Sequence, residues 1–150
     1  QNAYDWLSRQ MVLRIGPPQV VDVKYPIWAW HSLYQQHKKP DLRRIEFRGY
    51  SGQQLCIEIE IPDGEVLLSD KESWDFVLND CYFCPSQDFD LQGRWLTSLS
   101  DEEQKRITEK SWERIFDHTD FENNWSFVQA TFWELRREQV IGVREFNNRV

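Results

Sequence analysis

The stretch Leu55-Cys56-Ile57-Glu58-Ile59-Glu60-Ile61 alternates strictly between a large aliphatic side chain and a different residue type. Successive side chains of a β-strand point to opposite faces, so this period of two predicts a strand with one apolar face and one face in water. Such one-sided strands are typical of antiparallel or mixed sheets. We therefore expect a central strand whose inward face holds its four aliphatic residues: Leu55, Ile57, Ile59 and Ile61.

Turn and cap signals follow this strand. Pro62-Asp63-Gly64 is a turn sequence, and the extended segment 65–68 comes after it. Ser69 and Glu72 have the spacing of a capping box, which predicts a helix carrying Trp74 and Val77 on one face. Near the start of the sequence, the spacing of apolar residues from Ala3 to Met11 predicts an amphipathic helix. The aromatic segment 25–31 is predicted as a strand.

The second half of the chain alternates between helical and extended patterns. Residues 80–99 show no clear period and are predicted as an ordered loop. A helix is expected from Ser100 to about Phe116, and strands are expected over 125–135 and 140–146. Together these elements predict one domain over 1–150 of the α+β class, with a mixed or antiparallel sheet and helices packed on it.

Composition excludes several classes of protein. The 150 residues include 40% hydrophobic and 29% charged side chains, which suits a single globular core. A net charge of -7 disfavours binding to extended nucleic acid, because that binding needs a basic face. No apolar segment approaches the roughly 20 residues that cross a bilayer. Three cysteines, an odd number, fit a reducing compartment, so we expect a cytoplasmic protein.

The Cys81-Tyr82-Phe83-Cys84 segment has the spacing of a thiol pair that can bind zinc. A structural zinc site needs four ligands, and the sequence offers no second pair with matching spacing. We therefore predict no metal site and no disulfide.

Glu134 is the first candidate catalytic residue. Alternation along the predicted strand places it on the same face as Val128, Ala130 and Phe132. A buried carboxylate must be paired or have a raised pKa, and both situations are common at catalytic sites. Alternatively, Glu134 lies beyond the buried part of the strand and pairs with Arg136 or Arg137. Both interpretations remain open at this point.

Histidine and tryptophan supply the other candidates. His31 is the only histidine within a predicted strand, where it is either a catalytic base or donor, or a satisfied, partly buried side chain. Eight tryptophans are many for so small a core, so some of them either fill it or line a cleft for a flat ligand. The predicted cleft is bordered by Trp30, His31 and Glu134. Its predicted ligand-binding residues are Trp28, Trp30, Gln129 and Trp133.

Several segments resemble the bacterial domain-of-unknown-function family 3841 over nearly the whole chain. They include Arg14-Ile15-Gly16-Pro17-Pro18, Tyr25-Pro26-Ile27-Trp28-Ala29-Trp30, Cys56-Ile57-Glu58-Ile59-Glu60-Ile61-Pro62-Asp63 and Gln129-Ala130-Thr131-Phe132-Trp133-Glu134. The resemblance implies no activity. Members of that family open with a short extra strand before the first helix. We therefore expect a short N-terminal segment to be missing before Gln1, where the chain starts without an initiator Met.

The order of elements is also similar to that of small ADP-ribosyltransferase-like domains. That resemblance implies NAD as the cofactor and Glu134 as the late-strand carboxylate that polarises the nicotinamide ribose. The first motif of that superfamily, an Arg or His on the first strand, has no counterpart here. Architectural likeness alone does not establish an activity.

Two hypotheses of different classes follow. In the first, the domain is an NAD-using enzyme in which Glu134 and His31 are catalytic and the tryptophans hold a nucleotide. In the second, it is a non-catalytic binding module for a modified base or a protein partner. The two differ over whether Glu134 and Trp30 line one pocket.

Overall fold

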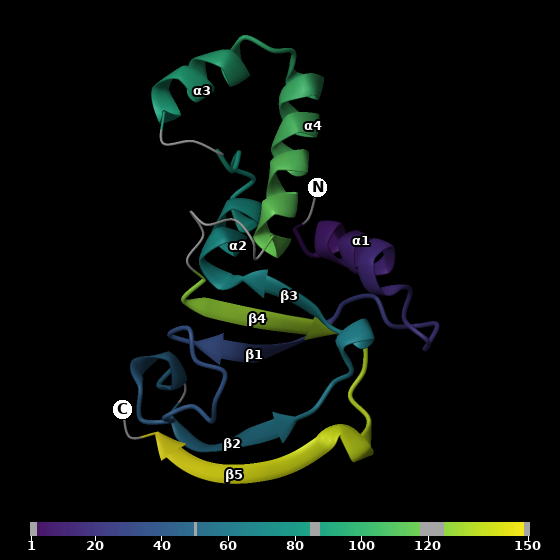
Figure 1. Cartoon of the computed structure of the whole chain (residues 1–150), viewed down its shortest axis with the longest axis vertical. Helices are drawn as coiled ribbons and strands as arrows, with labels where there is room; N and C mark the ends of the chain where they lie inside the picture. The colour runs from purple at the N-terminus through teal and green to yellow at the C-terminus, as the bar shows by residue number, and fades with distance from the viewer. Residues whose placement is uncertain (1–2, 50, 85–87, 118–124, 149–150) are drawn as a thin grey trace.

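The computed structural model of the protein describes residues 3–49, 51–84, 88–117 and 125–148, which form two small antiparallel sheets and the helices around them (Figure 1). The first sheet has the strand order β1-β4-β3 and the second pairs β2 with β5. The strands are β1 Ile27–Leu33, β2 Gly52–Ile59, β3 Leu67–Asp70, β4 Phe127–Phe132 and β5 Val140–Asn148. The predicted α+β class, with antiparallel sheets and packed helices, is confirmed.

Helices gather on one side of the three-stranded sheet, while α3 and α4 extend away from both sheets (Figure 1). The α-helices are α1 Ala3–Ile15, α2 Lys71–Leu78, α3 Phe89–Thr97 and α4 Asp101–Ser111. A short 3₁₀ segment, Trp112–Phe116, continues from α4. None of the helices in the described parts of the chain is long and apolar enough to cross a membrane.

The core lies between α1, α2, β3 and this 3₁₀ segment, and it is largely aromatic. Trp6 packs edge-on against Trp112 with ring centroids 5.4 Å apart, and it stacks on Phe116. A buried indole N–H needs an acceptor, and that of Trp112 donates to the carbonyl of Cys81 at 2.7 Å. These two tryptophans therefore fill the core, which is one of the two roles that the sequence left open for them. The buried apolar cluster comprises Trp6, Leu7, Met11, Leu67, Trp74, Val77, Phe83, Trp112 and Ile115.

The predicted role of the Ile-Glu-Ile strand as the centre of the core is wrong. Within the described chain β2 pairs only with β5, and its side chains Leu55 and Ile57 are 58% and 50% exposed. Its opposite face, which carries Cys56 and Glu58, is the half-buried one. Alternation correctly identified a strand with two unlike faces, but the face that turns inward depends on which elements pack on it.

The predicted loop at 80–99 is also wrong in part, because residues 89–97 form α3. Asp88 caps this helix, and its side chain accepts a hydrogen bond from the backbone N–H of Leu91 at 3.3 Å. Leu91 and Trp95, one helical turn apart, were the periodic signal that the loop prediction overlooked. A smaller correction concerns α2, whose N-cap is Asp70 instead of Ser69.

We predict that truncating the true core costs far more than truncating the apolar face of β2. Ile115→Ala removes a side chain with 0% exposure and should lower the free energy of unfolding by about 2–5 kcal/mol. Ile57→Ala, the matched control on the half-exposed face, should lower it by less than about 1 kcal/mol. Chemical denaturation measures both values. Equal losses would contradict the placement of the core.

Candidate functional site

A cleft separates the two sheets between β1 and β2. It consists of a first cavity of about 630 Å³ and a second of about 650 Å³. Volumes of this size are typical of ligand pockets in proteins. The two cavities meet along six residues that line both: Ala29, Trp30, His31, His37, Ile59 and Glu60.

The walls of the first cavity are strand edges. Residues 28–33 of β1 and the consecutive run 55–60, mostly in β2, all contribute to its lining. Side chains alternate across a strand, so the side chains of one face alone cannot supply such an unbroken run. The backbone of each strand therefore faces the cleft. In the described structure β1 pairs with β4 and β2 with β5. The facing edge of β2 has no strand partner, whereas the facing edge of β1 ends in an isolated bridge from Leu33 to Gln36, and His37 Nδ1 lies against the carbonyl oxygen of His31.

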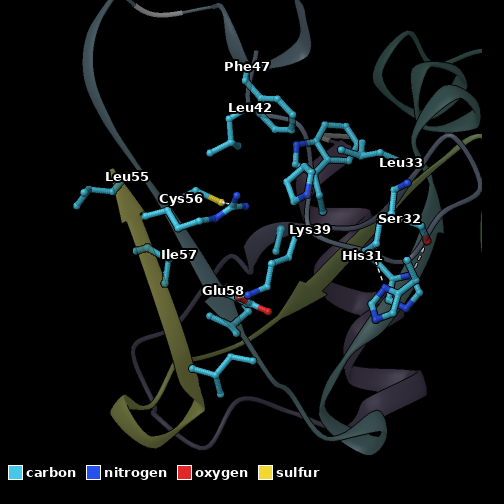
Figure 2. A pocket seen from close by; sticks show the side chains of 18 of the residues that line it. His31, Ser32, Leu33, Lys39, Leu42, Phe47, Leu55, Cys56, Ile57 and Glu58 are labelled. Carbon is cyan, nitrogen blue, oxygen red and sulfur yellow. Dashed lines mark hydrogen bonds and ion pairs between the residues drawn. The ribbon is translucent and has the colours of Figure 1, made fainter. Parts of the chain in front are cut away.

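The two cavities differ in the elements that surround the six residues they share. Leu42 and Phe47 from the segment after β1 and Arg144 from β5 enclose the first cavity (Figure 2). The second cavity is floored by the first sheet, through Ala130 and Phe132 of β4. Ala29 and Ala130 are directly paired and so lie on that same face of the sheet.

A β-bulge and a tight turn bring two histidines together at the cleft. Pairing of β1 with β4 shifts register between Trp30 and Ser32, which leaves His31 as the extra residue. Tyr34 and Gln35 then have positive φ angles of 52° and 60°, as a two-residue hairpin turn requires. This reversal stacks the ring of His37 on that of His31, with centroids 4.2 Å apart.

Hydrogen bonds fix both imidazoles. His31 Nδ1 lies 2.7 Å from the hydroxyl of Ser32, and His37 Nδ1 lies 2.6 Å from the carbonyl oxygen of His31. Partial burial lowers the pKa of His31, and the neighbouring His37 lowers it further, while Asp63 acts in the opposite direction. His31 is therefore held mainly in its neutral form near neutral pH, in which one ring nitrogen accepts a hydrogen bond.

Charged side chains of both signs line the first cavity. Its cations are Lys38, Lys39 and Arg144, and its carboxylates are Glu58 and Glu60. Lys39 reaches Glu58 across the cleft at 2.9 Å, and the two point toward one another (Figure 2). The cations thus outnumber the carboxylates in a protein whose net charge is -7.

Three of the predicted site residues lie at this cleft. Trp28, Trp30 and His31 all line the first cavity. The ring of Trp28 packs on Trp74 in the core, with centroids 5.2 Å apart, whereas Trp30 remains 41% exposed. Trp30 is therefore the tryptophan of β1 that a ligand can reach.

Gln129 and Trp133 do not line either cavity. Gln129 pairs with Trp30 across the sheet, and its buried side-chain oxygen has no hydrogen-bond partner among the described residues. Trp133 donates its indole N–H to the carbonyl of Gly16 at 2.9 Å. That bond ties the end of β4 to the end of α1.

The structure does not bring Glu134 to the cleft. Glu134 lies beyond the end of β4 and pairs with Arg136 at 2.9 Å. It borders a separate third cavity of about 60 Å³. Arg136 also contacts Glu65 at 2.8 Å and Glu138 at 3.4 Å, so one guanidinium balances three carboxylates. Hydrogen bonds from Arg136 to Glu65 and then to Glu134 raise the pKa of that guanidinium. The predicted cleft of Trp30, His31 and Glu134 is thus wrong in its third member.

Sequence inspection missed four side chains of the cleft: His37, Lys39, Glu58 and Arg144. His37 and Lys39 follow β1 in a polar segment that resembles an ordinary solvated loop. Glu58 was assigned to the wet face of its strand. No local pattern connects them, because their meeting depends on the turn after β1 and on the pairing of β2 with β5.

The three cysteines occupy different environments. Cys56 lines the first cavity, 3.7 Å from a guanidinium nitrogen of Arg144. Cys81 is exposed and Cys84 is half-buried, both outside the cleft. Among residues 3–49, 51–84, 88–117 and 125–148, no group of three or more His, Cys, Asp or Glu side chains is arranged to hold a metal ion.

Comparison with known proteins yields one match. A family model described as a domain of unknown function, DUF3841, matches residues 1–141. No curated protein and no solved structure matches the chain.

We predict that acid destabilises the protein through His31. The pKa of His31 is lowered in the folded state, whereas in the unfolded chain it should lie near 6.5. The unfolded state therefore takes up a proton first, and the free energy of unfolding should fall as the pH drops below about 6.5. NMR titration should place the pKa of His31 below that of a free histidine. His37→Gln should move it upward without fully restoring it, because burial is the larger cause. A wild-type value at or above 6.5 would contradict this environment.

We also predict that Arg136 is structural. Arg136→Met leaves three carboxylates without their shared cation, so the free energy of unfolding should fall at neutral pH. The loss should shrink at high salt, which screens ion pairs near the surface. Lys105→Met, an exposed cation on α4, is the matched control in urea denaturation. An equal change in the free energy of unfolding for the two variants would show that the three carboxylates do not need Arg136.

Proposed function

We propose that this chain, which belongs to the DUF3841 family, is a non-catalytic binding module. It takes a polypeptide segment of a partner protein into the cleft between its two sheets. The single observation that carries this proposal is the lining of the first cavity by the edges of β1 and β2 that face away from their strand partners β4 and β5. Unpaired strand edges offer rows of backbone donors and acceptors, which another polypeptide backbone can satisfy.

The dimensions of the cleft favour a linear occupant. The run 55–60 along β2 corresponds to a groove roughly 20 Å long. Residues 28–30 of β1 line its other side, up to the end that the Leu33–Gln36 bridge closes. Aliphatic and aromatic side chains, including Leu33, Leu42 and Phe47, line it together with charged ones. Mixed walls of this kind suit the varied side chains of a peptide.

The position of Glu134 favours a module over the enzyme hypothesis. Catalysis by this carboxylate requires it to meet the ligand, but it lies outside both main cavities and is bound to Arg136. In an ADP-ribosyltransferase-like mechanism, the carboxylates that meet a ligand in this cleft would be Glu58 and Glu60.

A nucleotide such as NAD is the second candidate ligand. It is favoured by the exposed ring of Trp30, which offers a stacking surface, and by Lys38, Lys39 and Arg144, which suit phosphate groups. This candidate retains the predicted roles of Trp30 and His31 but removes Glu134 from the site.

The deciding experiment blocks the cleft at Cys56. A variant with Cys81→Ser and Cys84→Ser leaves Cys56 as the single thiol, and alkylation with a bulky maleimide then fills the first cavity. Phage displaying random dodecapeptides are selected on the unmodified protein. We expect the selected peptides to lose at least tenfold in affinity when Cys56 is alkylated.

The matched control is Cys56→Ser with Cys84→Ser, alkylated at the exposed Cys81, which should bind the peptides normally. Failure to select any peptide, or equal binding to both alkylated proteins, would contradict the proposal. NAD and AMP are titrated in parallel by tryptophan fluorescence. Saturable quenching that disappears in Trp30→Ala but persists in Trp95→Ala, an equally exposed tryptophan on α3, would instead support the nucleotide candidate.

A further inference from the structure

The spatial order of the strands places the cleft between β1 and β2. Figure 1 shows β3, β4, β1, β2 and β5 following one another, with the break between β1 and β2. The arrows of β1 and β2 point in opposite directions in that view. A strand placed between them would run antiparallel to one and parallel to the other, as in a mixed sheet.

The second sheet has a physical reason to accept such a strand. It consists of β2 and β5 alone, and two-stranded sheets are only marginally stable without further strands or packing. Its Leu55 and Ile57 remain largely exposed, so little apolar burial supports it. Pairing along β2 would join it to the first sheet, which rests on the helical core.

Side chains of an inserted strand would alternate between the two cavities. Those on one face would enter the second cavity, whose lining includes the apolar residues Val66, Leu68, Ala130 and Phe132. Those on the other face would enter the first cavity, where Lys38, Lys39 and Arg144 outnumber Glu58 and Glu60. The preferred occupant therefore alternates apolar residues with polar ones, among which acidic side chains are favoured.

We propose that the partner segment inserts between β1 and β2 as an additional β-strand and joins the two sheets into one, in the order β3-β4-β1-partner-β2-β5. This inference rests on the proposed polypeptide-binding function and specifies how that binding occurs. The Lys39–Glu58 pair, which spans the cleft, opens to admit the strand. Since Lys39 is largely exposed, the loss of this pair is minor. On β1 the strand pairs with residues 27–30, because the Leu33–Gln36 bridge closes the far end of that edge.

Backbone N-methylation tests the insertion, because a methyl group on nitrogen removes a donor and blocks pairing while it preserves every side chain. The probe is the tightest dodecapeptide selected on the unmodified protein, made with single N-methyl groups at successive positions. In a strand held between two others, alternate N–H groups point to β1 and to β2. Methylation at both odd and even positions of the central six residues should therefore weaken binding at least tenfold.

Hydrogen–deuterium exchange supplies the readout on the protein. Addition of the unmethylated peptide should slow amide exchange in both Ile27–Leu33 and Gly52–Ile59, while the amides of Asp101–Ser111 in α4 serve as the internal control.

The outcomes distinguish a failure of the strand insertion from a failure of the proposed peptide-binding function. Peptide binding that survives N-methylation at all positions would overturn the strand insertion but leave the binding module standing. Weakening at only one set of alternate positions would indicate pairing with a single edge and would also overturn the insertion. Failure to select any peptide that Cys56 alkylation displaces would overturn both.

Discussion

The pairing of β4 with two neighbours determines how the rest of the molecule is arranged. β4 pairs with β1 on one edge and with β3 on the other, and its residues Thr131 and Phe132 are almost completely buried. Because β3 leads directly into α2, this sheet is attached to the helical core on one side. On the other side it ends at β1, whose other edge becomes a wall of the cleft. Beyond the bridge from Leu33 to Gln36, this edge has no strand partner among the described residues, whereas most buried backbone polar groups in proteins have a hydrogen-bond partner.

The tryptophans divide between two physical tasks. Trp6, Trp74 and Trp112 are buried, and they supply three of the nine residues of the buried apolar cluster. Trp30 and Trp95 keep more than two fifths of their surface exposed. Since exposed indole rings are enriched where proteins meet ligands or partners, the position of Trp30 on an edge strand at a cleft distinguishes it from Trp95 on the outer helix α3.

Two groups of ionisable residues with members in the lining of the second cavity have contrasting chemistry. Arg136 forms ion pairs with three carboxylates, and one of them is Glu134, the residue that the sequence suggested as a catalytic carboxylate. His31 and His37, in contrast, stack on each other within the cleft and keep His31 mainly neutral. The first arrangement is a structural ion-pair network of a kind that also perturbs pKa values without catalysis. The second leaves hydrogen-bonding groups beside the outer edge of β1.

The sequence by itself determined the features that depend on neighbouring residues in the chain. Period-two alternation located β2 and β4, helical spacing located α1 and α2, and the acidic turn at Asp101 marked the start of α4, because propensity and alternation are local. It also singled out Trp30 and His31, which the structure places in the lining of the same two cavities. Only the tertiary structure decided which face of β2 turns inward, since that depends on the absence of a packed layer over Leu55 and Ile57 among the described elements. It likewise decided that Glu134 meets Arg136 and that His37 meets His31, because the end of a strand, a bulge and a tight turn redirect side chains in ways that alternation does not encode.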